Sequence, residues 1–551
     1  MVLERARPAV GPYVFTPADR PTLPGSPYVP EHPGSRRFAY GLIAIVVALA
    51  ATLGNALVTV NLSNLAGGLS LYQAEVSWLP ALYVAFNATA NLTLIKARIQ
   101  FGVLRVTYVL LGGYVVMLGW QLLAPSFGAE MAVRAASGLC ASGLTTLTVY
   151  NLLQAAPAKL RPLALCVGIG LPQLGTPVAR LFPVELLALD HWRGLTLIEL
   201  AVAGAAFLAL HALPLPPNER RKVFERLDLL TIGLLVPAFV LICGVLSLGR
   251  ILWWTDTPWL GVALIAGLVL LALATLVERG RARPLVYVTW LTSRDMLRFA
   301  AIAVMMRLAL AEQTYGAVGL LTSGGLTNEQ LRGLFAAVLM AMILGITVSA
   351  VTLAPARLPF QVMIAALLIA LGASLDSHAS NLTRPAQLYI SQVLIAFGAS
   401  LFVGPALLYG FGRMITKGPD YLVSLIVLFS LTQNLGGLGG SALLGTVQTL
   451  AARGHARQLA DHLVAGDPQV AARLASGSAA LGGAGLDPAS RALQGGAQLA
   501  QAVSREASIL AFNDTFTFVA ALAALTAAYV AYVIVFNSLA RGPAKGGGVS
   551  S

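Results

Sequence analysis

The feature that most constrains this 551-residue chain is a series of apolar runs, each long enough to cross a lipid bilayer. The hydrocarbon core of a bilayer is about 30 Å thick, and a helix needs about 20 apolar residues to span it. Only 11% of the residues are charged, against about 25% in an ordinary soluble domain. The runs therefore predict an all-α integral membrane protein.

Fourteen such runs fall into groups of six, two and six. The first six-helix block covers 38–213, with spans at 38–62, 76–95, 103–124, 131–153, 162–186 and 194–213. A charged loop at 214–228 leads to two extra spans within 229–276, at 229–248 and 259–276. The second block covers 297–536, with spans at 297–321, 331–353, 359–375, 388–411, 421–447 and 509–536.

The net charge of +13 comes mainly from Lys and Arg in alternate loops, for example Arg220, Arg221 and Lys222 in the central loop. Loops rich in Lys and Arg stay on the cytoplasmic side of a membrane. This bias predicts a multi-pass protein of a bacterial-type inner membrane with both termini in the cytoplasm. The basic excess is thus a topology signal, and we expect no nucleic-acid partner.

Three segments lie outside the predicted spans. Residues 1–37 are rich in proline and lack the apolar region of a signal peptide, so they predict a disordered cytoplasmic tail. Residues 537–551 form a second predicted tail. Residues 451–505 contain no span-length apolar run and predict a long periplasmic loop, with helical patches at 455–463 and 468–474.

The sequence carries no enzyme, cofactor or metal signature. Cys140, Cys166 and Cys243 all fall within apolar runs. This placement predicts small core residues, and it argues against disulfide bonds and a metal site. We therefore expect neither catalysis nor a bound cofactor.

Several short stretches resemble one family of transporters. They are Val76-Ser77-Trp78 with Tyr83, Asp190-His191-Trp192-Arg193, the turn from Trp253 to Trp259, and Ala511-Phe512-Asn513-Asp514. Together with the six-plus-two-plus-six pattern, they resemble the EmrB-like branch of the fourteen-helix drug:proton antiporters of the major facilitator superfamily. The resemblance implies two six-helix bundles that export small molecules in exchange for protons. It also implies a periplasmic adaptor and an outer-membrane channel as partners.

The chain departs from the pattern of this family at three positions. Ile99 stands where the family has an aspartate in the loop after the second span, so an Asp-based latch cannot operate there. Gly54 stands in the first span, where relatives often have a membrane-embedded Asp. Arg180 replaces a usual glycine of the fifth-span motif, which survives only as Gly175-Thr176-Pro177.

Charged residues within the predicted spans are candidates for proton coupling, because a charge at bilayer depth costs at least about 2.5–3.5 kcal/mol. Arg134 opens an Arg-x-x-x-Gly pattern that the resemblance ties to proton transfer; the alternative is an interfacial arginine that snorkels to the headgroups. Glu199 could titrate beside Arg180, or the two could simply neutralise one another. Glu312 is a candidate proton carrier, unless it lies in water at the outer end of its span.

Other polar residues within the spans are candidates for substrate binding. Arg180 and Arg307 could bind an anionic group. Asn87 and Asn91 share one helix face, but hydrogen bonds between helices explain such asparagines equally well. The full set of substrate-binding candidates is Arg180, Arg307, Asn55, Asn61, Asn87, Asn91, Gln313 and Tyr315.

The sequence thus predicts an efflux transporter for amphipathic or aromatic compounds, with anions favoured by the intramembrane arginines. The alternative is an uncoupled facilitator or a transporter-derived binding and sensing protein, because Asp is lost at 99 and the fifth-span motif is altered.

Overall fold

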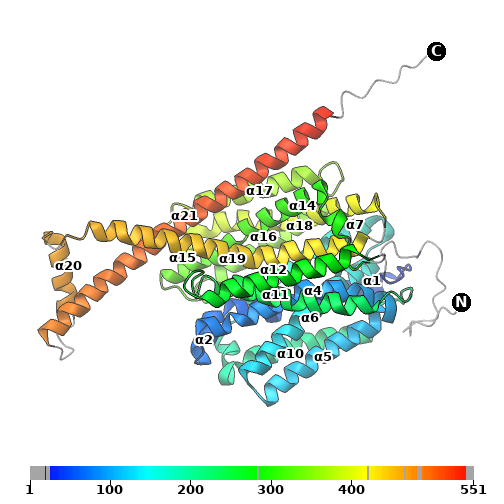
Figure 1. Ribbon diagram of the computed structural model, residues 1–551, viewed down its shortest axis with the longest axis horizontal. Helices are drawn as coiled ribbons and strands as arrows, with labels where there is room; N and C mark the ends of the chain where they lie inside the picture. The colour runs from blue at the N-terminus through cyan, green and yellow to red at the C-terminus, as the bar shows by residue number, and fades with distance from the viewer. Residues whose placement is uncertain are drawn as a thin grey trace, which may run out of the picture.

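The computed structural model describes residues 19, 25–281, 284–418, 421–464, 466–480 and 487–540, and the regular elements of this part are helical. Twelve helical segments are long and apolar enough to cross a membrane. They pack side by side in one bundle, from which a hairpin projects at one end (Figure 1). The prediction of an all-α, multi-pass membrane protein is confirmed.

Six segments build the first half of the bundle. Their cores pack through two apolar clusters, one around Tyr40 and Leu118 and one around Leu57 and Leu187. The fifth segment is broken at Leu171–Leu174, where Pro172 lies two residues after Gly170, the end of α7. The elements are α1 (Gly34–Val60), α2 (Leu62–Gly68), α3 (Gln73–Val76), α4 (Trp78–Phe101), α5 (Val103–Leu123), α6 (Phe127–Ala155), η2 (Ala158–Leu160), α7 (Arg161–Gly170), η3 (Leu171–Leu174), α8 (Gly175–Ala179), α9 (Val184–Leu187) and α10 (Leu189–Ala212).

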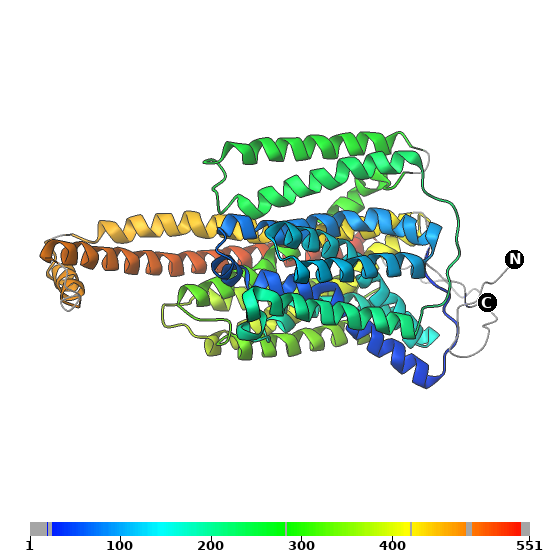
Figure 2. The same ribbon diagram turned by 90° about the horizontal axis from the view of Figure 1, so that it is seen from below.

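The two extra helices are α11 (Arg226–Leu248) and α12 (Pro258–Arg279). They pack against one another on the flank of the bundle, and α11 also contacts α4 and α19 (Figure 2). The extra pair therefore touches both halves of the bundle.

The second half is built around an apolar cluster that includes Phe299, Ile369, Phe402 and Val519. Its elements are α13 (Val288–Leu291), α14 (Arg294–Ala309), η4 (Glu312–Ala317), α15 (Val318–Ser323), α16 (Arg332–Val351), α17 (Leu358–Asp376), η5 (Pro385–Leu388), α18 (Tyr389–Ile415), α19 (Leu422–Asp461), α20 (Pro468–Ala479) and α21 (Pro488–Ala540).

Two predicted spans are not among the twelve segments, although their helices lie inside the bundle (Figure 1). The span 131–153 corresponds to α6, which carries buried polar side chains such as Arg134, Asn151 and Gln154. The span 297–321 corresponds to α14, η4 and α15, where the helix is interrupted by a π-helical turn. A polar core and a broken helix explain why these two segments are less apolar or shorter than the rest.

The segment 451–505 is more helical than the predicted loop: the patch at 455–463 lies largely on α19, the patch at 468–474 lies on α20, and helix extends beyond both. Helix α19 continues to Asp461 and α21 already begins at Pro488, so the two project beyond the bundle as a helical hairpin with α20 against α21 (Figure 2). Alanine, glutamine and leucine are strong helix formers, and they continue the helices without an apolar run. We call the end that carries this hairpin the hairpin face.

The opposite end, where α1 begins, is the N-terminal face. The predicted disorder of 1–37 is wrong for 25–37, while most of 1–24 lies outside the described residues. Helix α1 starts at Gly34, and His32 is 5% exposed with its ring on the Gln154 side chain at 2.8 Å. The proline-rich stretch is held because the bundle offers buried polar partners to it.

Candidate functional site

A buried ion cluster joins three helices of the first half. Arg134 of α6 is fully buried, and its guanidinium donates to the Glu199 carboxylate of α10 and lies 3.0 Å from Glu130. The Tyr114 hydroxyl of α5 donates to the same Glu199 carboxylate. The snorkelling alternative for Arg134 is therefore wrong, because two carboxylates hold its charge inside the protein.

Glu199 occupies space that a side chain on α1 would otherwise fill. A Cβ built on Gly54 would lie within 2.5 Å of the Glu199 Cδ atom. An acidic group from α10 therefore reaches the space beside position 54 of α1. Gly54 is thus a requirement of the cluster, since any side chain there displaces the Glu199 carboxylate.

The expected pairing of Arg180 with Glu199 is wrong. Arg180, 7% exposed at the end of α8, donates to the Asn328 side chain at 2.5 Å and lies over the Phe335 ring. Asn328 in turn donates to the Asn61 side chain at 3.1 Å. The structure therefore brings Arg180 and Asn61 together at the hairpin face, where both form hydrogen bonds with Asn328 of the second half.

A second acidic site lies in the other half of the bundle. Glu312 is fully buried and Asp376 is 2% exposed, and both carboxylates accept from the Gln392 side-chain amide. The distances from Gln392 Nε2 are 3.1 Å to Glu312 Oε1 and 2.7 Å to Asp376 Oδ2. The alternative that Glu312 lies in water at the end of its span is therefore wrong. The residue is buried and lies beside a second carboxylate.

The backbone at Glu312 is irregular. Glu312 begins the π-helical turn η4, and such turns inside α-helices are frequent at functional sites. Gln313 donates to the Gln392 carbonyl oxygen at 3.3 Å, so it supports the same site. Tyr315, at the other side of the turn, accepts from Arg250 at 3.3 Å and lies under its guanidinium.

The asparagines of α4 form hydrogen bonds between the halves. The Asn91 amide donates to the Ser430 hydroxyl at 3.0 Å, and Asn87 accepts from Asn434 at 3.1 Å. Bonds of this kind favour the structural alternative for both residues. Asn55 differs, because its side-chain oxygen is buried and has no hydrogen-bond partner among the described residues.

Arg307 of α14 has no acidic partner. Its Nε donates to the Gln433 carbonyl oxygen at 3.1 Å, and no carboxylate lies within 4.0 Å of it in the described part of the chain. Its side chain runs over Gly436 and Gly437 of α19, near the middle of the 294–323 segment. The expectation that Arg307 and Glu312 do not pair is confirmed.

Sequence reasoning missed Asp376 and Gln392. Asp376 is the last residue of α17, and an acidic residue at a helix end gives by itself no sign of a site. Gln392 lies near the start of α18. No local pattern distinguishes either residue. Only the packing of α14, α17 and α18 places them against Glu312.

No protein-family model and no curated protein matches the sequence. Solved structures do match, and one is the human organic anion transporter MFSD10 (TETRAN), with 14% identity, a TM-score of 0.52, and 90% of this chain and 100% of that chain covered. Another is a bacterial homologue of the human drug peptide transporters PepT1 and PepT2, with 10% identity, a TM-score of 0.54, and 91% and 99% covered. This chain has the major facilitator fold. At such identities the likeness shows the fold alone, and it is the fold of membrane transporters.

Within the major facilitator fold the two acidic sites have different surroundings. The Glu199 carboxylate is neutralised by Arg134, whereas Glu312 and Asp376 share one neutral amide with no cation within 4.0 Å among the described residues. Two uncompensated negative charges so close together in an apolar interior would be very unfavourable.

Proposed function

We propose that this protein is a proton-coupled efflux transporter for amphipathic or aromatic anions. The observation that carries the proposal is the buried pair Glu312 and Asp376 around Gln392. The pair is stable in the apolar interior only when a proton replaces the missing cation. Loss of that proton creates a charge repulsion that movement of the helices can relieve.

The membrane field supplies the energy for this exchange. A charge that crosses a potential of about 100 mV releases about 2.3 kcal/mol, which corresponds to about a 50-fold concentration gradient. Glu199 is unsuited to this role because Arg134 and Tyr114 hold its carboxylate. We therefore assign proton exchange to Glu312 with Asp376, and a structural role to Arg134 with Glu199.

The substrate charge is inferred by comparing the three arginines that the sequence singles out, Arg134, Arg180 and Arg307. Arg134 is neutralised by two carboxylates, and Arg180 is engaged at the hairpin face by Asn328. Arg307 is partly buried, and among the described residues its guanidinium contacts a backbone carbonyl and no carboxylate, so its charge lacks an acidic partner. An anionic substrate would supply it, and one solved structure of the same fold is an organic anion transporter.

Replacing Arg307 with glutamine is expected to weaken binding of an aromatic carboxylate about tenfold or more, because a hydrogen bond to a charged group is lost. Salicylate binding to the purified protein measures the effect, with uncharged salicylamide as the matched ligand. Lysine at 307 should retain part of the affinity. Equal salicylate affinity in wild type and Arg307→Gln, or no salicylate binding by wild type, contradicts the assignment.

The finer classification is part of the proposal. Counting α6 and the α14–η4–α15 segment as spans gives fourteen, arranged as in the EmrB-like branch. An even number of crossings places both termini on one side, and the basic loops favour the cytoplasm of a bacterial-type inner membrane. The hairpin then lies in the periplasm.

We propose the hairpin as the docking surface for a helical periplasmic adaptor that leads to an outer-membrane channel. Helix α19 has 40 residues, or about 60 Å at 1.5 Å per residue, twice the membrane core. On the hairpin, Leu450, Val464 and Leu493 are 54–77% exposed. Serine at all three positions should abolish co-purification of a co-expressed adaptor. Undiminished co-purification refutes this partner.

A further inference from the structure

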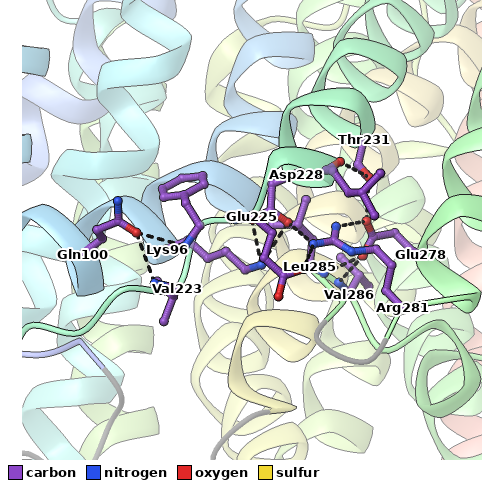
Figure 3. Close-up of polar contacts among 12 residues, drawn as sticks. Lys96, Gln100, Val223, Glu225, Asp228, Thr231, Glu278, Arg281, Leu285 and Val286 are labelled. Atoms are coloured by element: carbon purple, nitrogen blue, oxygen red, sulfur yellow. Dashed lines mark hydrogen bonds and ion pairs between the residues drawn. The ribbon is translucent and has the colours of Figure 1, made fainter.

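At the N-terminal face, the first half of the bundle is tied to the extra helices by charge. The Lys96 ammonium of α4 donates to both Asp228 carboxylate oxygens of α11 at 3.0 Å (Figure 3). The Asp228 side chain is fully buried and that of Lys96 is 10% exposed. Lys96 lies three residues before Ile99, the position that lacks the family's aspartate.

Arg281, just after α12, extends this contact. Its guanidinium donates to Asp228 at 2.6 Å, to Glu225 at 2.9 Å and to Glu278 at 2.7 Å (Figure 3). Burial alone would lower the pKa of Arg281, but hydrogen bonds to Asp228, Glu225 and Glu278 raise it above its ordinary value. Arg281 therefore stays charged at every physiological pH, and the contact does not respond to pH through this group.

Glu278 connects this ion cluster to the second half of the bundle. Its carboxylate accepts from the Leu285 backbone N–H at 2.5 Å, and two residues later the Tyr287 N–H donates to Ser424 of α19 at 2.8 Å. The Tyr287 ring packs on Tyr421 with centroids 4.5 Å apart. An unbroken series of contacts thus runs from α4, through α11 and α12, to α19.

The residues around Ile99 bind the central loop. The Gln100 side chain accepts from the Val223 and Phe224 N–H groups, and the Ile99 carbonyl accepts from Arg221. The turn after α4 therefore holds the central loop 214–228 in place, and with it the start of α11. This positions Asp228 for Lys96.

We propose that the relay Lys96–Asp228–Arg281–Glu278 is a latch that keeps the N-terminal face of the transporter closed. The relay acts in addition to the direct hydrogen bonds between α4 and α19, so opening at this face also requires the buried Lys96–Asp228 contact to break. This inference rests on the proposed transport cycle, but its test needs neither substrate nor protons.

The native Cys166 provides a reporter of this opening. It lies 3% exposed on α7, and its Sγ is 3.5 Å from the Ser349 hydroxyl of α16, in the other half. With Cys140 and Cys243 replaced by alanine, the reaction of purified protein with a membrane-impermeant maleimide measures how often the halves separate. Lys96→Met and Arg281→Gln should each speed the labelling of Cys166 about tenfold.

Lys96→Arg is the matched control and should label at the wild-type rate. Ser424→Ala tests the far end of the relay. The double variant Lys96→Met, Ser424→Ala should label no faster than the faster single variant, because both changes open one latch. Wild-type rates in both Lys96→Met and Arg281→Gln overturn the proposal, as do rates that multiply in the double variant. Gel filtration and the melting temperature verify that each variant is folded.

Discussion

Replacing Glu312 with glutamine is expected to abolish proton-driven transport and to leave the protein folded. Glutamine has nearly the same shape as a protonated glutamate, and it can still contact the Gln392 amide. It cannot release a proton, so the about 50-fold accumulation that a proton gradient equivalent to about 100 mV supports should be lost. Salicylate uptake into proteoliposomes with an imposed pH gradient measures the change.

Asp376→Asn should have the same effect, because both carboxylates accept from one amide and the proposed mechanism has them share one proton. Glu329→Gln serves as the control, since Glu329 is 50% exposed and pairs only with Arg332 in the described part of the chain. Passive exchange of substrate without a gradient should survive in both site variants. Gradient-driven uptake at the wild-type level in Glu312→Gln would favour the uncoupled facilitator instead.

Replacing Glu199 with alanine is expected to cost about 3–5 kcal/mol of stability, because it removes the partner of a fully buried arginine. Glu130 remains 3.0 Å from Arg134 and compensates part of the charge, so the lower end of this range is expected. The melting temperature of the detergent-solubilised protein should fall clearly. The loss is larger than that for an exposed ion pair, which contributes about 0–1 kcal/mol.

An aspartate at position 54 is expected to restore part of the stability that Glu199→Ala loses. Asp at 54 in the Glu199→Ala background returns a carboxylate to the same space from α1, since a Cβ on Gly54 points at the Glu199 carboxylate. The double variant should recover a substantial part of the melting temperature, whereas Gly54→Asp alone should be destabilising. Failure of the double variant to exceed Glu199→Ala would show that Arg134 needs the geometry of α10.

The sequence alone predicted most of the architecture. Apolar length and charge placement indicated the helices, because a span must match the membrane thickness wherever it packs. The same reasoning predicted only patches of the helical hairpin at 451–505 and missed the packed segment 25–37, since neither carries a span-length apolar run. It also singled out Arg134, Glu199 and Glu312 as costly charges, but it could not tell which group each charge contacts.

Partners within the membrane were decided by tertiary structure. Arg180 and Glu199 are neighbours on adjacent predicted spans, yet Arg180 contacts Asn328 and Glu199 contacts Arg134. Asp376 and Lys96 gained their importance only when α17 packed beside η4 and α11 packed beside α4. Hydropathy is a property of each segment and is readable from the sequence. A charge partner depends on how rotated helices meet across the chain, and only the packed structure fixes that.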